Sequence, residues 1–235
     1  MLTINQLDLF LELVYIPGGS FQMGSEKDNR EKPIHKVNIQ PFYMSKYLIT
    51  QRQYQEIMEI NPSNFKEQNL PVEKVSWNDA TEFCEKLSEI TEGTYSLPSE
   101  SQWEYACRAG TTTPYYFGES ITTELANYNG SDDRPPGENR TKTTEVGIFP
   151  PNAFGLYDMH GNVYEWCEDI WHDDYNEAPD DGSAWLEGGY NNNRVFRGGS
   201  WGSIAGLCRS AYRDWDNADD HINIRGFRIV YVPSV

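Results

Sequence analysis

Few side chains of this 235-residue chain could do redox or metal chemistry, and those few lie far apart. No two cysteines share the C-x-x-C spacing of zinc sites, and no two histidines show a paired ligand spacing. No serine occupies a nucleophile-elbow sequence, which argues against a Ser-His-Asp hydrolase. We therefore expect free thiols and a location in the reducing cytoplasm. The residues concerned are Cys84, Cys107, Cys167, Cys208, His35, His160, His172 and His221.

Oxygen ligands are grouped more closely. The segment from Asp158 to Glu165 has a carboxylate at each end, with small and polar residues between them whose backbone carbonyls are available. Calcium accepts such a mixed and flexible set of carboxylate and carbonyl oxygens. We expect a structural calcium ion at this segment. The alternative is that the two carboxylates cap turns or pair with nearby arginines.

The charge of the chain limits its partners. Its formal net charge is −17 and its pI is about 4.5, with no basic run that could neutralise phosphates. We therefore expect neither nucleic acid nor an anionic membrane surface as a partner, whereas cations and basic ligands remain open. The N-terminal sequence lacks a basic region and does not resemble a signal peptide, and no stretch is apolar enough to span a bilayer. The length fits one domain, residues 1–235.

Three segments are expected to form helices. Each opens with a hydroxyl residue that is followed, three positions later, by a side chain able to complete a capping box. Apolar residues then recur at helical spacing, and Cys84 and Cys107 fall on these apolar faces, where we expect buried thiols. The pairs that open the helices are Thr50 with Gln53, Ser76 with Asp79, and Ser99 with Gln102.

The rest of the chain favours short strands and long loops. The regions from Thr111 to Val146 and from His172 to Asn193 are longer than most loops in compact domains, which indicates function or pinning by a ligand such as a metal. We predict an α+β fold with short antiparallel strands, few helices and many long loops. The strand candidates run from Leu13 to Ile16, Lys36 to Ile39, Arg194 to Arg197 and Gly226 to Val232.

A series of motifs, in order over about nine-tenths of the chain, resembles the formylglycine-generating (sulfatase-modifying) enzyme family. They are residues 16–24 (IPGGSFQMG), 75–80 (VSWNDA), 97–106 (LPSESQWEYA), 108–110 (RAG), 151–166 (PNAFGLYDMHGNVYEW), 197–201 (RGGSW) and 226–228 (GFR). The resemblance implies a C-type-lectin-type fold. It does not fix the function, because one fold hosts unrelated activities.

The enzymes of this family, as the resemblance implies, use two thiols five residues apart, shortly after the Gly-Gly-Ser motif, to hold copper and activate oxygen. In this chain the first position is Ser203, and only Cys208 stands near the second. Soft thiolates are the expected Cu(I) ligands, so we expect no copper. A second branch of the family holds iron through histidines of an additional N-terminal helical domain, which this sequence does not contain, so we expect no iron either.

The resemblance also implies calcium ligands at specific positions. The first set would be the side chains of Asp158 and Glu165 with the carbonyls of Gly161 and Val163. A second set would use Asn127, the carbonyl of Tyr128 and Glu138, although the intervening loop departs from the family pattern.

The C-terminal region has an unusual composition. After Glu187 there is no Lys, Glu, Gln or Met. An asparagine codon changed only at its two adenines can never produce these four residues, and it can produce most loop residues found here. Placed between the RGGSW and GFR motifs, the pattern resembles the variable region of diversity-generating retroelement target proteins, several of which have this fold. In those proteins adenine-directed mutagenesis rewrites a displayed binding surface.

We therefore predict a ligand-binding region over residues 201–225. Its apolar residues would form a contact cluster, and its acidic residues would suit a basic protein, peptide or small ligand. Two alternatives remain, a formylglycine-generating or related oxidase and a regulatory or scaffolding domain with fixed partners; the isoleucines could also belong to the core. The predicted contact residues are Trp201, Gly202, Ser203, Ile204, Leu207, Asp214, Trp215, Asp216, Asn217, Asp220, His221, Ile222, Asn223 and Ile224.

Overall fold

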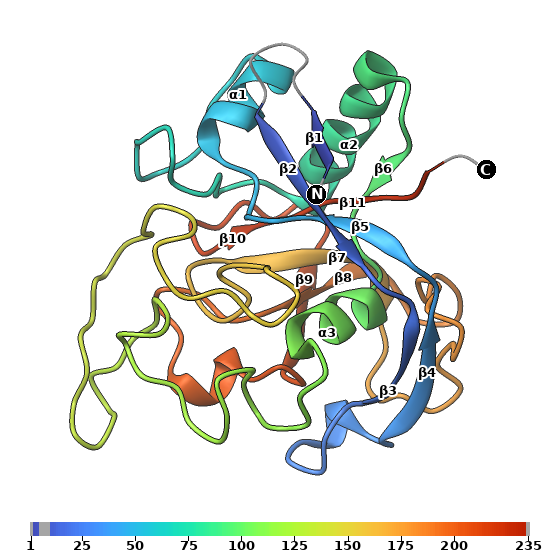
Figure 1. Cartoon of the computed structure of the whole chain (residues 1–235), viewed down its shortest axis with the longest axis vertical. Helices are drawn as coiled ribbons and strands as arrows, with labels where there is room; N and C mark the ends of the chain where they lie inside the picture. Colours follow the sequence, from blue (N-terminus) through green and yellow to red (C-terminus); the bar gives the residue numbers. More distant parts are fainter. Residues whose placement is uncertain (1, 5–9, 234–235) are drawn as a thin grey trace.

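The regular structure consists of short strands and three α-helices joined by long loops (Figure 1), seen in a computed structural model that describes residues 2–4 and 10–233. This is the predicted α+β architecture. The first and the last strand of the described chain, β1 (Leu2–Ile4) and β11 (Val230–Tyr231), belong to one sheet. Among the described residues, none of the helices has the length and apolar character that a membrane crossing needs.

The strands form three sheets, and nearly all neighbours are antiparallel. Among the paired strands of the described residues, only β10 (Arg225–Gly226) and β7 (Tyr164–Trp171) run parallel. The strand β9 lies at one edge of its sheet, paired on one side with β8. The five-stranded sheet has the order β1 (Leu2–Ile4), β2 (Leu11–Ile16), β5 (Phe42–Ser45), β11 (Val230–Tyr231) and β6 (Tyr95–Ser96); the four-stranded sheet has the order β10 (Arg225–Gly226), β7 (Tyr164–Trp171), β8 (Tyr190–Arg197) and β9 (Arg213–Asn217); β3 (Gly19–Met23) pairs with β4 (His35–Ile39).

The three expected helices are present, and each has the predicted capping box, in which the hydroxyl accepts from the third backbone N–H and the third side chain accepts in return. Their apolar faces are buried, including the thiols of Cys84 and Cys107. The helices are α1 (Gln51–Met58), α2 (Trp77–Thr91) and α3 (Glu100–Arg108), and two short 3-10 helices are η1 (Asn29–Glu31) and η2 (Ala205–Cys208).

One strand prediction was wrong. The run from Gly226 to Val232 is not continuous, because β10 ends at Gly226 and the chain then crosses to the five-stranded sheet as β11. Arg228 lies at the crossing with its side chain fully buried, and it donates from Nη1 to the carbonyl of Ser45 at 3.1 Å. The crossing links the two sheets through this guanidinium, which an apolar strand pattern does not reveal.

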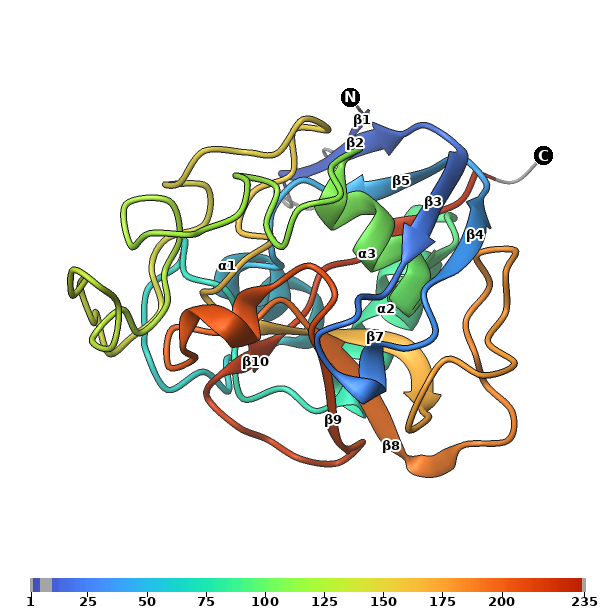
Figure 2. The ribbon, with the colours of Figure 1, turned by 90° about the horizontal axis from the view of Figure 1, so that it is seen from below.

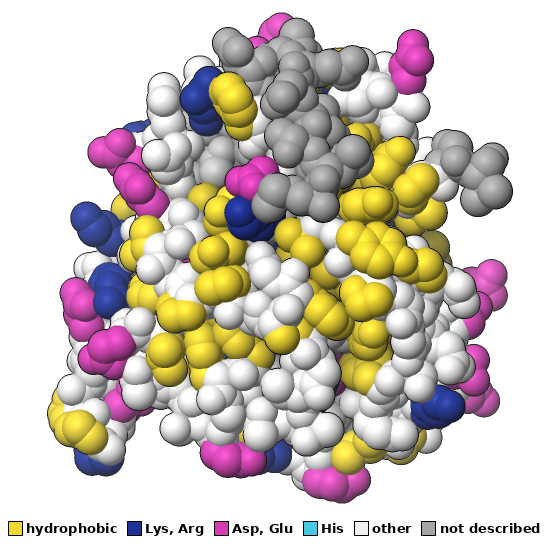
Figure 3. Space-filling model, viewed as in Figure 1, with side chains coloured by type: hydrophobic (Ala, Val, Ile, Leu, Met, Phe, Trp, Pro, Cys, Tyr) yellow, Lys and Arg dark blue, Asp and Glu magenta, His cyan; other side chains and the backbone are white. Residues whose placement is uncertain are grey.

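The face drawn in Figure 3 is rich in hydrophobic side chains where β5, β6 and β11 lie in Figure 1. Across this sheet, four tyrosines on neighbouring strands stand in register, with ring centroids 5.0 to 6.0 Å apart. Cross-strand aromatic pairs of this kind stabilise sheets. The row consists of Tyr15, Tyr43, Tyr231 and Tyr95.

A buried ionic cluster joins α3 to the four-stranded sheet. Arg197 on β8 donates to Glu100 at 2.9 Å and also contacts Glu104, and Arg213 on β9 binds Glu100 with two hydrogen bonds of 2.8 Å. Both guanidinium groups are fully enclosed. Charges buried in this way must stay paired, since removing one partner leaves an uncompensated ion. The cluster therefore fixes the strands on which the C-terminal segment is mounted.

Candidate binding surface and cation sites

The predicted binding segment starts at a turn that only glycine can make. Gly198 and Gly199 have φ of +94° and +78°, and a Cβ at Gly199 would lie 2.4 Å from the sulfur of Cys208. The backbone N–H of Ser200 donates to the hydroxyl of Ser203 at 3.0 Å, which closes the next turn. The chain then enters η2, which Figure 2 shows on the same side of the molecule as β9 and β10.

The predicted contact residues divide by exposure. Five of them are exposed: Gly202, Ile204, Trp215, His221 and Ile222. The half-buried ones are Trp201, Leu207, Asp214, Asp216, Asn217, Asp220, Asn223 and Ile224. Leu207 and Ile224 pack against the hydrophobic core, so the alternative that some apolar residues serve the core holds for these two.

Ser203 is the exception among the predicted contact residues, because its side chain is buried and cannot contact a partner. Its hydroxyl donates to the hydroxyl of Tyr164 at 3.1 Å and accepts from Ser200. Its place in the predicted contact set is corrected accordingly: the side chain closes the turn that carries Gly202 and Ile204.

Of these five exposed residues, Trp215 lies on the edge strand β9, whereas Gly202 and Ile204 precede that strand in a loop and His221 and Ile222 follow it. Side chains alternate along a strand, so Trp215, opposite Val195, faces away from the side of Asp214 and Asp216. The ring of Trp215 lies 6.3 Å from that of Trp171. A partner in contact with the whole segment would therefore wrap around β9.

The two acidic residues of β9 are partly neutralised by arginines. Asp214 lies 3.4 Å from Arg30, and Asp216 contacts Arg225. Burial by itself raises the pKa of Asp216. The hydrogen bonds from Asp220 and from the backbone N–H of Asn217, together with the charge of Arg225, outweigh burial and lower this pKa. The hydrogen bond shared with Asp216 raises the pKa of Asp220 in turn. The negative charge offered to a ligand is thus smaller than the sequence indicates.

The chemistry of the family's oxidases would require an accessible thiol at Cys208. Its side chain is fully buried, and this burial raises the pKa of the thiol to about 12. A neutral thiol is a poor nucleophile and a poor metal ligand. The position of the first thiol of the pair is held by Ser203. All four cysteines are buried and free of disulfides.

The histidines lie at separate places. His160 is buried between Cys107 and the Tyr116 backbone; its Nδ1 lies 2.7 Å from the Cys208 carbonyl, and its Nε2 accepts from the Tyr116 N–H at 3.1 Å. Burial lowers its pKa to about 3, so it is neutral and structural. Within the part of the chain that the structure describes, no group of three or more His, Cys, Asp or Glu side chains is arranged to hold a metal ion.

The first calcium set does not form a cage. Both oxygens of Glu165 are bound, because Arg228 donates to them from Nε at 2.5 Å and from Nη2 at 2.9 Å, and Trp103 donates at 2.8 Å. Asp158 is also buried; one oxygen accepts from the Gly147 N–H at 2.7 Å, and the other has no partner within the described residues. Burial raises the pKa of Asp158 to about 6. The unpaired oxygen of Asp158 could bind a cation, but both oxygens of Glu165 are already bound by Arg228.

Gly161 and Val163, the other two predicted ligands of the first calcium site, belong to a segment that lies beside Asn127 of the second site. Gly161 has φ of +84°, and a Cβ there would lie 2.3 Å from the carbonyl oxygen of Asn127. The next N–H, that of Asn162, donates to the same carbonyl at 2.7 Å. Val163 is fully buried. The close approach of the two backbones brings the loop that contains Asn127 against the 158–165 segment.

The second set offers more free oxygens. The side-chain oxygen of Asn127 is buried without a partner among the described residues, as are the hydroxyl oxygens of Thr143 and Thr144. These unsatisfied oxygens fit a hard cation. Glu138, in contrast, is mostly exposed and pairs with Arg140 at 2.8 Å. The threonines were not predicted, because a hydroxyl in a loop gives no distinctive sequence pattern.

Tyr128, the third member of the second set, is fully buried, and its hydroxyl lies 2.5 Å from a carboxylate oxygen of Asp133. The next residue, Asn129, donates from its backbone to the carbonyl of Ser203 at 2.8 Å. This loop therefore supports the turn that precedes η2.

Comparison with known proteins settles the family. The sulfatase-modifying factor enzyme 1-like domain matches residues 5–232. This chain belongs to that family. The predicted resemblance to the formylglycine-generating-enzyme family and its fold is thereby confirmed.

The chain is also similar to several known proteins. The structure of PvdO from Pseudomonas aeruginosa is 33% identical, with a TM-score of 0.87 and coverage of 98% of this chain and 97% of that one. Treponema denticola variable protein 1 is 25% identical, with a TM-score of 0.81 and coverage of 95% of both chains. Serine/threonine-protein kinase pkn1 of Chlamydia pneumoniae is 31% identical over 94% of this chain, which spans only 38% of that protein's length.

Proposed function

We propose that this chain is a ligand-binding domain that uses residues 201–225 as its contact surface, and that it is not an oxidase. The observation that carries the proposal is that the segment exposes large apolar side chains although its supporting frame is rigid and buried. Ile204, Trp215 and Ile222 are large apolar side chains between 37% and 48% exposed, on a frame locked by buried arginines. Exposed apolar residues on loops held by a rigid scaffold are typical of binding surfaces. The likeness to a variable protein of Treponema denticola supports a diversified surface.

The partner we propose is a basic protein or peptide, or a small cationic ligand. The net charge of −17 favours such ligands and disfavours nucleic acid and anionic membranes. The four free, buried cysteines support a reducing compartment, the cytoplasm. Calcium is proposed as a structural ion at the free oxygens near Asn127.

The test is a pair of display libraries. One library randomises Ile204, Trp215 and Ile222; the matched library randomises Ile60, Ile90 and Ile148, which are between 41% and 58% exposed elsewhere on the chain. We expect both to display folded protein, and only the first to yield binders to a panel of basic peptides. Equal yields from both libraries would refute a specialised surface. A copy of the coding segment in neighbouring DNA that differs only at adenines would separate diversified from fixed partners.

The oxidase alternative needs its own assay. The purified chain would be loaded with Cu(I) and incubated with a cysteine peptide and oxygen, and the aldehyde product would be measured by mass spectrometry. Because the thiol of Cys208 is buried and its pKa is raised to about 12, we expect no product. Formation of the aldehyde would overturn the proposal.

A further inference from the structure

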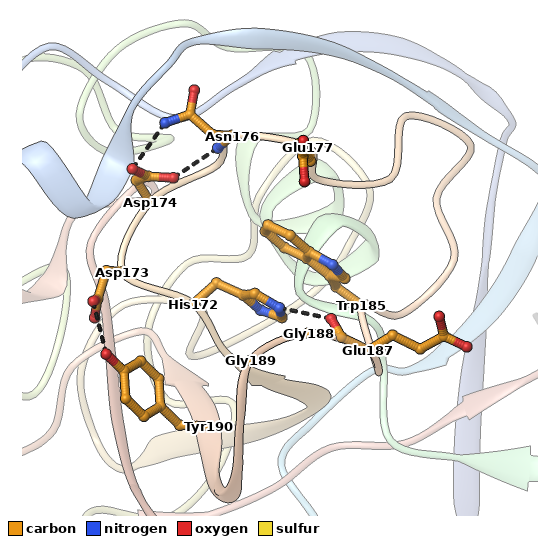
Figure 4. A pocket seen from close by; sticks show the side chains of 10 residues that line it. All are labelled: His172, Asp173, Asp174, Asn176, Glu177, Trp185, Glu187, Gly188, Gly189 and Tyr190. Carbon is orange, nitrogen blue, oxygen red and sulfur yellow. Dashed lines mark hydrogen bonds between the residues drawn. The ribbon is translucent and has the colours of Figure 1, made fainter.

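The long loop between β7 and β8 lines a solvent-open cavity that has no wall residue from the 201–225 segment. The cavity has a volume of about 510 Å³ and is drawn in Figure 4. Cavities of this size commonly hold small ligands. Its lining combines aromatic rings, acidic side chains and one amide: His172, Trp185 and Tyr190; Asp173, Asp174, Glu177 and Glu187; and Asn176.

The aromatic part of the lining is rigid. The rings of His172 and Trp185 are stacked, with centroids 3.4 Å apart and an angle of 4° between their planes. The backbone N–H of Trp185 donates to Asp169 at 2.9 Å, and the ring of His172 lies within hydrogen-bonding distance of the carbonyls of Ile170 and Glu187, at 3.2 and 2.9 Å. The stack is therefore held in place before any ligand arrives.

A glycine allows the strand to approach this stack. A Cβ at Gly189 would lie 2.4 Å from the carbonyl oxygen of Trp171 and 2.7 Å from the ring of His172. Any other residue would push the β8 end of the loop away from the imidazole. The sequence Gly188-Gly189 thus shapes the cavity wall as well as the turn.

The acidic part of the lining is not neutralised by the protein. Within the described ranges, 2–4 and 10–233, none of Asp173, Asp174, Glu177 and Glu187 forms an ion pair with Lys, Arg or His. Asp173 accepts from Trp171 Nε1 and the Tyr190 hydroxyl, both at 3.0 Å. Carboxylates around a concave, aromatic surface concentrate a negative potential in it.

We infer that this cavity binds an organic cation, the guanidinium or alkylammonium group of a ligand. Aromatic faces attract such cations through their negative quadrupole, and the carboxylates supply the opposite charge. A metal ion is disfavoured, because these carboxylates are not arranged as a ligand set of three or more. The inference stands apart from the proposed function, since none of the lining residues belongs to 201–225.

The test measures binding of small probes by calorimetry and by the indole N–H signal of Trp185 in NMR spectra. The probes are N-acetylarginine methylamide and N-acetyllysine methylamide, with the neutral citrulline analogue as the matched probe. We expect the two cations to bind and to shift the Trp185 signal, more strongly at low salt, and the citrulline analogue to show no binding. If one cation binds and the other does not, that result identifies which of the two groups the cavity accepts.

Variants separate the cavity from a general attraction to an acidic protein. Glu187→Gln should weaken cation binding about threefold at low ionic strength, and Trp185→Leu about tenfold. The matched control, Glu145→Gln, removes an exposed carboxylate elsewhere and should change nothing. Equal weakening by Glu145→Gln, or binding of the citrulline analogue, would overturn the inference, as would no binding of either cation. The alanine variant of Trp215 should retain cation binding, so that failure here is distinguishable from failure of the proposed surface.

Discussion

Replacing Glu165 by Gln tests the strongest energetic statement that the structure makes. Glu165, Arg228 and Trp103 are all fully buried and joined by three hydrogen bonds of 2.5 to 2.9 Å. The glutamine has the same shape but no charge, so it leaves the guanidinium of Arg228 buried with only carbonyl and amide partners.

The expected cost is large. Removing one partner of a buried ion pair costs about 3–5 kcal/mol, because the remaining charge stays out of water. For a domain of this size that corresponds to a fall in Tm of about 6–20 °C. The matched control is Glu138→Gln, which breaks the pair with Arg140 at a side chain that is 60% exposed. Exposed pairs contribute less than about 1 kcal/mol, so the control should keep the Tm nearly unchanged.

The assay is urea denaturation of the three proteins, each with calcium and with a chelator. We expect the loss in Glu165→Gln to be the same under both conditions. If calcium stabilised the wild type and this gain disappeared in Glu165→Gln alone, Glu165 would be a calcium ligand, and its assignment as the partner of Arg228 would be wrong. A loss below about 1 kcal/mol would also refute the buried-pair argument.

Three further predictions concern other buried groups. Burial raises the pKa of Asp158 from 3.8 to about 6, so the folded state binds this proton more tightly than the unfolded state does. The free energy of unfolding should therefore fall by up to about 3 kcal/mol as the pH rises from about 4 to 6. The variant Asp158→Asn should remove this slope in urea titrations carried out at several pH values. Calcium should raise the Tm of the wild type and of Glu138→Gln, whereas Asn127→Ala should lose that gain in differential scanning fluorimetry; an undiminished gain would place the ion elsewhere. A thiol reagent should label none of the four cysteines in the native protein and all four in denaturant, and rapid native labelling of Cys208 would contradict its burial.

Local patterns in the sequence predicted the local elements well. The capping boxes at Thr50, Ser76 and Ser99 depend on residues three positions apart, and all three are present as predicted. The family motifs predicted the fold, because they occur in order along almost the whole chain. Short-range chemistry and motif order were sufficient for these features.

Long-range partners could not be predicted. Glu165 resembled a calcium ligand in sequence; pairing with an arginine was the alternative, but no spacing rule identifies Arg228, 63 residues away, as that arginine. The same holds for Ser203, which the loop composition placed at the surface and which instead bonds to Tyr164, 39 residues earlier. The continuous strand from Gly226 to Val232 was wrong for a related reason, since the chain changes sheets there.

The arginines that flank and interrupt the C-terminal segment explain how its surface could change without loss of the fold. Arg197, Arg213 and Arg228 are fully buried and paired with glutamates of α3 and β7, so the frame is fixed by residues that point inward. Substitutions at exposed positions away from such features usually change stability by less than about 0.5 kcal/mol. Ile204 and Ile222 meet this condition, whereas Asp216 does not, because it contacts Arg225. A diversified surface on this frame would therefore vary most at the exposed positions and least where a side chain neutralises an arginine.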